Sequence, residues 1–125
     1  MKTELMYAPR YFDNSEFTGL TPSCDITQMS TALLIKLDAL RVYCGFALRI
    51  TSAYRSKDWD LAKGRSGKGP HTQGLAVDIA CTDSWSRGRI LQGAFELDFH
   101  GIGIGSNFIH LDIMPREYNR LVWTY

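Results

Sequence analysis

The sequence of 125 residues lacks any long apolar run. No stretch approaches the roughly 20 consecutive apolar residues that a membrane helix needs, so we expect no membrane partner. Residues 1–11 contain an early lysine but no apolar segment of about 7 to 15 residues, which a secretory signal would require. We therefore expect synthesis in the cytoplasm without a signal peptide.

The sequence also lacks a strong charge of either sign. Fourteen Lys and Arg residues oppose thirteen Asp and Glu residues, which gives a formal net charge of +1. This balance predicts neither an acidic tail nor strong attraction to nucleic acid, so we expect no nucleic-acid partner. The basic loop at residues 63–68 leaves one alternative, a nucleic-acid module, which salt-dependent DNA binding would reveal.

Cysteine is scarce, and its spacing fits no metal or redox pair. Cys24, Cys44 and Cys81 are odd in number and form no C-x-x-C pattern, so they are interpreted as buried thiols. The sequence contains no internal repeat and no linker-like stretch. Its length suits one hydrophobic core, so we expect a single domain over residues 1–125, and a monomer.

Apolar spacing predicts two helices. A capping-box pattern at residues 25–28 precedes apolar residues at helical spacing, and Gly45 supplies the stop. A second helix, capped by Asp83 or Ser84, is predicted through about Leu97.

Strands are predicted between and after these helices. An apolar run at 46–50 continues towards polar residues up to 55, and residues 75–81 form another strand. Residues 101–105 and 108–113 are typical of a hairpin. The stretch 57–70, rich in Gly, Lys, Ser and Asp, predicts a loop with room for one helical turn. The fold class is therefore α+β, with a small antiparallel sheet flanked by helices.

Potential metal ligands lie on two of these strands. Side chains alternate along a strand, which places Asp78 on the face opposite its apolar neighbours and does the same for His110 and Asp112. If the two strands pair as antiparallel neighbours, Asp78 and His110 lie within about 5 Å of each other. His71 belongs to the loop that enters the first strand.

Catalytic zinc sites commonly use three His or carboxylate ligands and leave a fourth position for water, whose pKa falls to about 7. His71, Asp78 and His110 provide such a set. The spacing H-x6-D is less specific than H-E-x-x-H, however. From spacing alone, the alternative of two structural histidines stays open.

Five segments resemble, in order, the motifs of the zinc D-alanyl-D-alanine carboxypeptidase family, peptidase family M15. That family also includes phage L-alanyl-D-glutamate endopeptidases. The segments are YFDNSEF at 11–17, ITSAYRS at 50–56, HTQGLAVDI at 71–79, GIGI at 101–104 and FIHLD at 108–112. The resemblance covers nearly the whole chain.

The resemblance implies roles for particular residues. His71, Asp78 and His110 match the family's ligands for Zn²⁺. Arg55 matches the arginine that binds substrate and steadies the transition state, which suits a guanidinium that can hold a carboxylate or an oxyanion. The alternative for Arg55 is an ordinary surface ion pair.

Two positions depart from the family pattern. Gly69 replaces a serine that often stands two residues before the first ligand. Asn107 replaces an acidic general base three residues before the last ligand, and an amide cannot accept a proton from water. Asp112, on the same strand face as His110, is then the candidate base. The alternative role for Asp112 is to orient a ligand histidine through its carboxylate.

The resemblance implies a zinc-dependent peptidase that hydrolyses amide bonds of the peptidoglycan stem peptide, as a D-Ala-D-Ala carboxypeptidase or as an endopeptidase. Its phage-like size suggests a lysis or entry enzyme that acts on the bacterial cell wall, associated with the host cell or the virion. The alternative is a catalytically silent, zinc-stabilised module that binds the cell wall, as Asn107 suggests.

Overall fold

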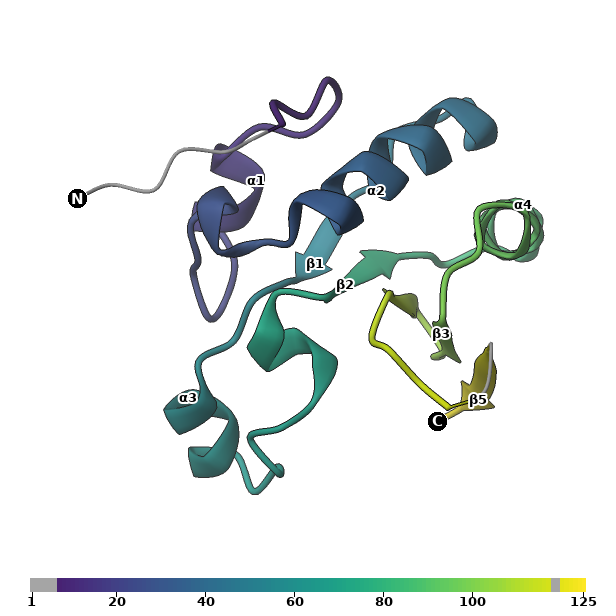
Figure 1. Ribbon diagram of the computed structural model, residues 1–125. Coiled ribbons are helices and arrows are strands. Elements are labelled where there is room, and N and C mark those ends of the chain that lie inside the picture. The colour runs from purple at the N-terminus through teal and green to yellow at the C-terminus, as the bar shows by residue number, and fades with distance from the viewer. Residues whose placement is uncertain (1–6, 118–119) are drawn as a thin grey trace.

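A five-stranded mixed sheet organises the chain in a computed structural model that describes residues 7–117 and 120–125 (Figure 1). Its strands run in the order β1-β2-β4-β3-β5, and all neighbours are antiparallel except β3 and β5. The strands are β1 (Ile50–Ser52), β2 (Ala76–Ala80), β3 (Gly101–Ile104), β4 (Phe108–Asp112) and β5 (Leu121–Thr124). The predicted α+β class is confirmed, and β5, which was not predicted, makes the sheet mixed.

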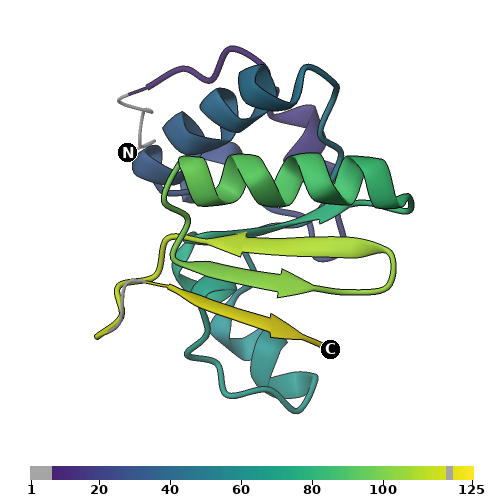
Figure 2. The same ribbon diagram turned by 90° about the vertical axis from the view of Figure 1, so that its right-hand side faces the viewer.

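The helices are distributed unequally about this sheet. They are α1 (Ser15–Thr18), α2 (Thr31–Cys44), α3 (Lys57–Ala62) and α4 (Ser84–Glu96), with 3-10 turns at Ile26–Gln28 and Pro70–Gln73. In Figure 2, α2 and α4 lie together on one side of the sheet and α3 lies towards the other. None of the helices in the described part of the chain is both long and apolar enough to span a bilayer.

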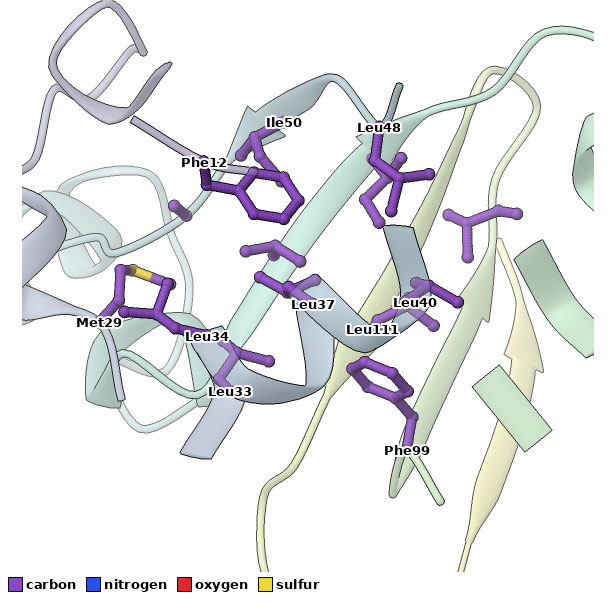
Figure 3. Packing of buried hydrophobic residues seen from close by; sticks show 14 of the residues in the cluster. Phe12, Met29, Leu33, Leu34, Leu37, Leu40, Leu48, Ile50, Phe99 and Leu111 are labelled. Atoms are coloured by element: carbon purple, nitrogen blue, oxygen red, sulfur yellow. The ribbon is translucent and has the colours of Figure 1, made fainter. Parts of the chain in front are cut away.

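The hydrophobic core fills the space between the sheet and the paired helices (Figure 3). Strands β2 and β4 contribute alternate side chains that are fully buried, and α2 contributes four leucines. These residues are Val77, Ile79, Ile109, Leu111, Leu33, Leu34, Leu37 and Leu40. Full burial of each such side chain contributes about 1.5–3 kcal/mol, so this face of the sheet carries most of the stability. The opposite face is free to hold polar groups.

Helix α2 begins later than predicted. The capping box at Asp25 forms, but it closes only the 3-10 turn Ile26–Gln28. Met29 is extended, and Ser30 donates its N–H to the carbonyl of Gly74 at 2.9 Å before its side chain caps α2. A backbone contact far away in the sequence therefore interrupts the helix. Its end at Gly45, in the left-handed region at φ 77°, is confirmed.

Other predicted elements are found with changed limits. The helix capped by Asp83 and the hairpin of β3 and β4 are confirmed. The strand predicted from residue 46 is ordered as a strand only in β1, and the loop 57–70 contains the helix α3. All three cysteines are free and buried, as predicted.

Candidate metal centre and its cleft

Asp78 and His110 face each other across β2 and β4. They are direct partners in the antiparallel register, so the predicted pairing of the two strands is confirmed. Val77 and Ile79, on either side of Asp78, are fully buried in the core, whereas Asp78 retains partial exposure. Strand alternation thus turns both ligand-type side chains towards the face opposite the helices.

His71 reaches the same place from the 3-10 turn before β2. Its carbonyl accepts the N–H of Arg55 at 3.1 Å, and its Nδ1 lies 2.7 Å from the carbonyl oxygen of Ala53. Both contacts tie the turn to the segment that follows β1. The orientation of the imidazole is therefore fixed, with Nε2 directed at Asp78.

Three ligand-type atoms form a nearly equilateral triangle. His71 Nε2 and Asp78 Oδ1 are 3.3 Å apart, His110 Nδ1 and Asp78 Oδ1 are 3.2 Å apart, and the two nitrogens are 3.3 Å apart. Tetrahedral zinc with bonds of about 2.0–2.1 Å separates its ligand atoms by about 3.3–3.4 Å. The donor set and its spacing both fit such an ion, and these three residues form a group that could hold a metal.

Each histidine is anchored through the nitrogen that faces away from this triangle. His71 uses Nδ1 against Ala53, and His110 places Nε2 at 2.7 Å from Asp112 Oδ2. Metal-binding histidines commonly donate the second N–H to a carbonyl or a carboxylate, which fixes the tautomer. Both imidazoles have this arrangement.

Asp112 lies behind His110, away from the triangle. It is fully buried and receives two hydrogen bonds from Arg116, at 2.6 and 3.0 Å, and one from the N–H of Met114. Burial disfavours the carboxylate, but contacts with His110 and Arg116 outweigh it and lower the pKa of Asp112 to about 2. This position favours the alternative of an orienting carboxylate over that of a general base.

His110 lies between two carboxylates. Burial disfavours its charged form, but hydrogen bonds with Asp112 and Asp78 outweigh this effect and raise the pKa of His110. Burial likewise disfavours the charge on Asp78, and its contacts with His110 and His71 overcome that effect and lower the pKa of Asp78. Both aspartates therefore remain anionic at neutral pH, as a cation site requires.

Arg55 lines the same cleft as the three residues of the triangle. Its Nη1 donates to Ser52 Oγ at 3.3 Å, and its Nε lies 3.5 Å from Asp60 Oδ1 without the geometry of a hydrogen bond. The guanidinium also lies 5.9 Å from the ring centre of Trp59. Burial lowers the pKa of Arg55, although an arginine stays charged throughout the ordinary pH range. Its side chain is 16% exposed, so it can still meet a ligand.

A cleft of about 400 Å³ opens over the triangle. Cationic and aromatic side chains dominate its lining, and Asp78 is the only carboxylate among the described residues that line it. The lining consists of Arg55, Arg65, Pro70, His71, Asp78, Phe108, His110, Arg116, Trp123 and Tyr125. Such a cleft suits a substrate that carries carboxylates.

Sequence reasoning missed three residues of this cleft: Arg116, Trp123 and Tyr125. Strand β5 brings Trp123 to 5.2 Å from His110, measured between ring centres. The space exists because Gly103, opposite His110 in the register, has no side chain, and a Cβ there would lie 2.6 Å from Trp123 Nε1. The alternation of glycine in 101–105 was the available signal, since it indicates that something packs closely on that face.

Asn107 is placed beside the cleft and not in its lining. It belongs, with Asp78 and Phe108, to the lining of a second hollow next to the first. Its amide cannot accept a proton from water, so the structure provides no base at this position.

Comparison with known protein families agrees with the motifs. A family model described as Peptidase M15 matches residues 11–112, which include the triangle, Arg55 and Asp112. A comparison with curated proteins finds no match. The match covers most of the chain, and the chain belongs to the peptidase M15 family.

Proposed function

We propose that this chain is a zinc-dependent peptidase that hydrolyses amide bonds in the peptide part of bacterial peptidoglycan. The observation that carries the proposal is the triangle of His71, Asp78 and His110, whose spacing fits tetrahedral zinc at the floor of an open cleft. Zinc bound there would supply Lewis acidity and would lower the pKa of a coordinated water to about 7. Substrate identity rests on the resemblance, and so does a role as a phage lysis or entry enzyme.

The chain's own residues have distinct roles in this proposal. Arg55 binds a substrate carboxylate or the oxyanion that develops during attack on the amide, since its guanidinium lies beside the triangle and is held by Ser52. Asp112 orients His110, and Arg116 holds Asp112 in place. Trp123 covers one side of His110 and limits its access to water.

A second candidate is a zinc-stabilised module that binds the cell wall without cleaving it. One observation favours it: in the described lining of both hollows, Asp78 is the only carboxylate, and it belongs to the triangle. Within that described lining, no further acidic side chain is then available to accept a proton from water. In a peptidase, the lowered pKa of the coordinated water would reduce the need for a separate base.

Zinc-dependent release of new amines or of D-Ala from purified peptidoglycan tests the proposal. The full chain is loaded with zinc and incubated with several wall types, with and without a chelator. His110→Ala, which removes one corner of the triangle, is the inactive control. Binding to the wall without any release, by a folded and zinc-loaded protein, would favour the silent module.

A further inference from the structure

A second hollow of about 390 Å³ lies beside the cleft and shares two of its residues, Asp78 and Phe108. Its volume falls within the range of ligand-binding pockets, about 300–1,000 Å³. The remaining lining is mainly polar, with three hydroxyl side chains, an amide and a guanidinium. These residues are Arg49, Thr51, Ser52, Ala80, Thr82 and Asn107.

Strand geometry makes the second hollow continuous with the site. Ala80 follows Asp78 by two residues, so it lies on the same face about 7 Å further along β2. Its register partner is Phe108, which bounds one side, and β1 bounds the other. Because the side chain of Ala80 is a single methyl group, it leaves space between Phe108 and β1. About two residues of an extended peptide fit along this length.

The charge of the second hollow indicates what it accepts. Arg49 is exposed at its edge because its neighbour Ile50 faces the core. No ion pair involves Arg49 among the residues that the structure describes. Asp78, which the triangle engages, is the only carboxylate of the lining. A cation with no acidic partner suits a ligand carboxylate.

We propose that this second hollow is a substrate subsite, so that an acidic peptide lies across the triangle and is cut at an internal bond. This inference rests on the proposed peptidase function and deepens it. A carboxypeptidase needs a site that is closed just beyond the scissile bond, whereas here the substrate has binding surface on both sides. Arg55, Arg65 and Arg116 serve one side, and Arg49 with its hydroxyl neighbours serves the other.

Two peptides that differ only at the carboxyl end separate the two modes of cleavage. One is N-acetylated L-Ala-γ-D-Glu-L-Lys-D-Ala-D-Ala with a free carboxylate, and the other carries a carboxamide there. The zinc-loaded full chain is expected to cleave both at the same internal bond, with rates that agree within about threefold, as mass spectrometry of the products would show. Cleavage of the free acid alone, at its last bond, would overturn the inference and leave the peptidase function intact.

Variants of the second hollow test its contribution. Arg49→Ala is expected to raise KM about two- to fivefold, the range of an exposed ion pair, with kcat and zinc content unchanged. Ala80→Leu fills the space between Phe108 and β1 and is expected to raise KM further. The matched control is Arg10→Ala, an exposed arginine whose backbone contacts Asp38 of α2, on the core side of the sheet. Unchanged KM in both hollow variants would contradict the subsite.

Binding to the zinc-free chain gives a readout that needs no turnover. Titration with the carboxamide peptide is expected to shift the backbone amide resonances of Thr51, Thr82 and Asn107, together with residues of the cleft. Shifts confined to the cleft would overturn the subsite. Absence of hydrolysis in every assay, combined with shifts in the second hollow, would refute the peptidase function and retain the subsite.

Discussion

Hydrogen bonds link Arg116 to Asp112 and Asp112 to His110, and they favour one tautomer of this buried histidine of the candidate metal centre. Asp112 Oδ2 accepts from His110 Nε2, which leaves Nδ1 unprotonated towards the triangle when a metal is bound. The two hydrogen bonds from Arg116 fix the plane of the carboxylate. Because such partners typically change metal affinity 10- to 100-fold, their effect should be visible in zinc binding before any assay of turnover.

Replacement Asp112→Asn is expected to weaken zinc binding about 10- to 100-fold. The asparagine must meet both Arg116 and His110 with a single acceptor oxygen, so the orientation of His110 is lost. Competition with a chromogenic chelator measures the affinity, and circular dichroism checks the fold. Asp98→Asn is the control, because Asp98 is exposed and pairs with Arg120 away from the site.

The same variant decides between the two roles of Asp112. An orienting carboxylate predicts that saturating zinc restores a substantial part of the activity. A general base predicts unchanged zinc affinity and a loss in kcat of about 10²- to 10⁴-fold that zinc does not restore. The second result would return the role of base to Asp112 despite its burial.

Arg55→Lys tests whether the shape of the guanidinium matters as well as its charge. Lysine keeps the charge but loses the planar group that can hold two oxygen atoms at once. We expect kcat/KM to fall about 10- to 1,000-fold while zinc content stays at one ion per chain. Wild-type kcat/KM in this variant would reduce Arg55 to an ordinary ion pair with Asp60.

At the scale of elements, the glycines of β3 leave room for side chains of the neighbouring strands. Gly101 and Gly103 lie on the face of the site, and a Cβ on Gly101 would come within 2.2 Å of Asp112 Oδ2. A Cβ on Gly103 would instead meet Trp123 of β5. The bare backbone therefore allows Asp112 and Trp123 to lie over β3, close to His110.

Gly103→Ala is expected to push Trp123 away from His110 and to destabilise the fold by about 1–3 kcal/mol, the usual cost of overpacking. Tryptophan fluorescence during zinc titration and thermal unfolding measure the two effects. Gly88→Ala is the matched control, because Gly88 lies in α4 and a methyl group there would meet no atom within 4 Å. That change should stabilise by about 0.5–1 kcal/mol. Equal behaviour of the two variants would contradict the packing role of Gly103.

Elements with strong local signals could be predicted from sequence. Alternation in β2 and β4 was sufficient to place Asp78 and His110 on one face, because a two-residue period leaves no other choice once the core face is known. Helix α4 could also be predicted from local signals, because its N-terminal cap and the spacing of its apolar residues both indicate a helix.

Features that depend on distant partners could not be predicted. The break before α2 depends on Gly74, and β5 gains its place only by pairing in parallel with β3. Consequently Trp123 and Arg116 were missed as parts of the site. Asp112 was assigned to the correct face, but its salt bridge with Arg116, four residues later, could not be inferred from alternation.

At the scale of the whole molecule, the sheet separates stability from chemistry. Its core face packs against α2 and α4, whereas its other face carries Asp78, His110 and Asp112, with His71, Arg55 and Arg116 beside them from the adjoining segments. Changes on the site face are therefore expected to alter metal and substrate binding more than they alter folding. The pH dependence of stability is the exception. The titrating groups of the site are buried, so their protonation also changes the free energy of unfolding.

The stability of the metal-free chain should be highest at mildly acidic pH. The pKa of His110 is raised in the fold, so its contribution is present below the unfolded value of about 6.5 and is lost as the pH rises. The pKa values of Asp78 and Asp112 are lowered, so their contributions are present above about 3.8 and are lost as the pH falls. The expected plateau thus lies between about pH 4 and 6.5.

Zinc should reverse the loss of stability that the metal-free chain shows as the pH rises. A histidine must be neutral to bind zinc, so the ion competes with the proton that His110 holds more tightly because its pKa is raised by Asp112 and Asp78. The stabilisation by zinc therefore grows with pH. At 100 times the dissociation constant the gain is about 2.7 kcal/mol. Thermal unfolding with chelator and with excess zinc, from pH 5 to 8, measures the difference. A zinc effect that is constant over this range would show that His110 is not a ligand. His110→Ala, which lacks the titrating imidazole, should show neither the loss of stability at high pH nor most of the zinc effect.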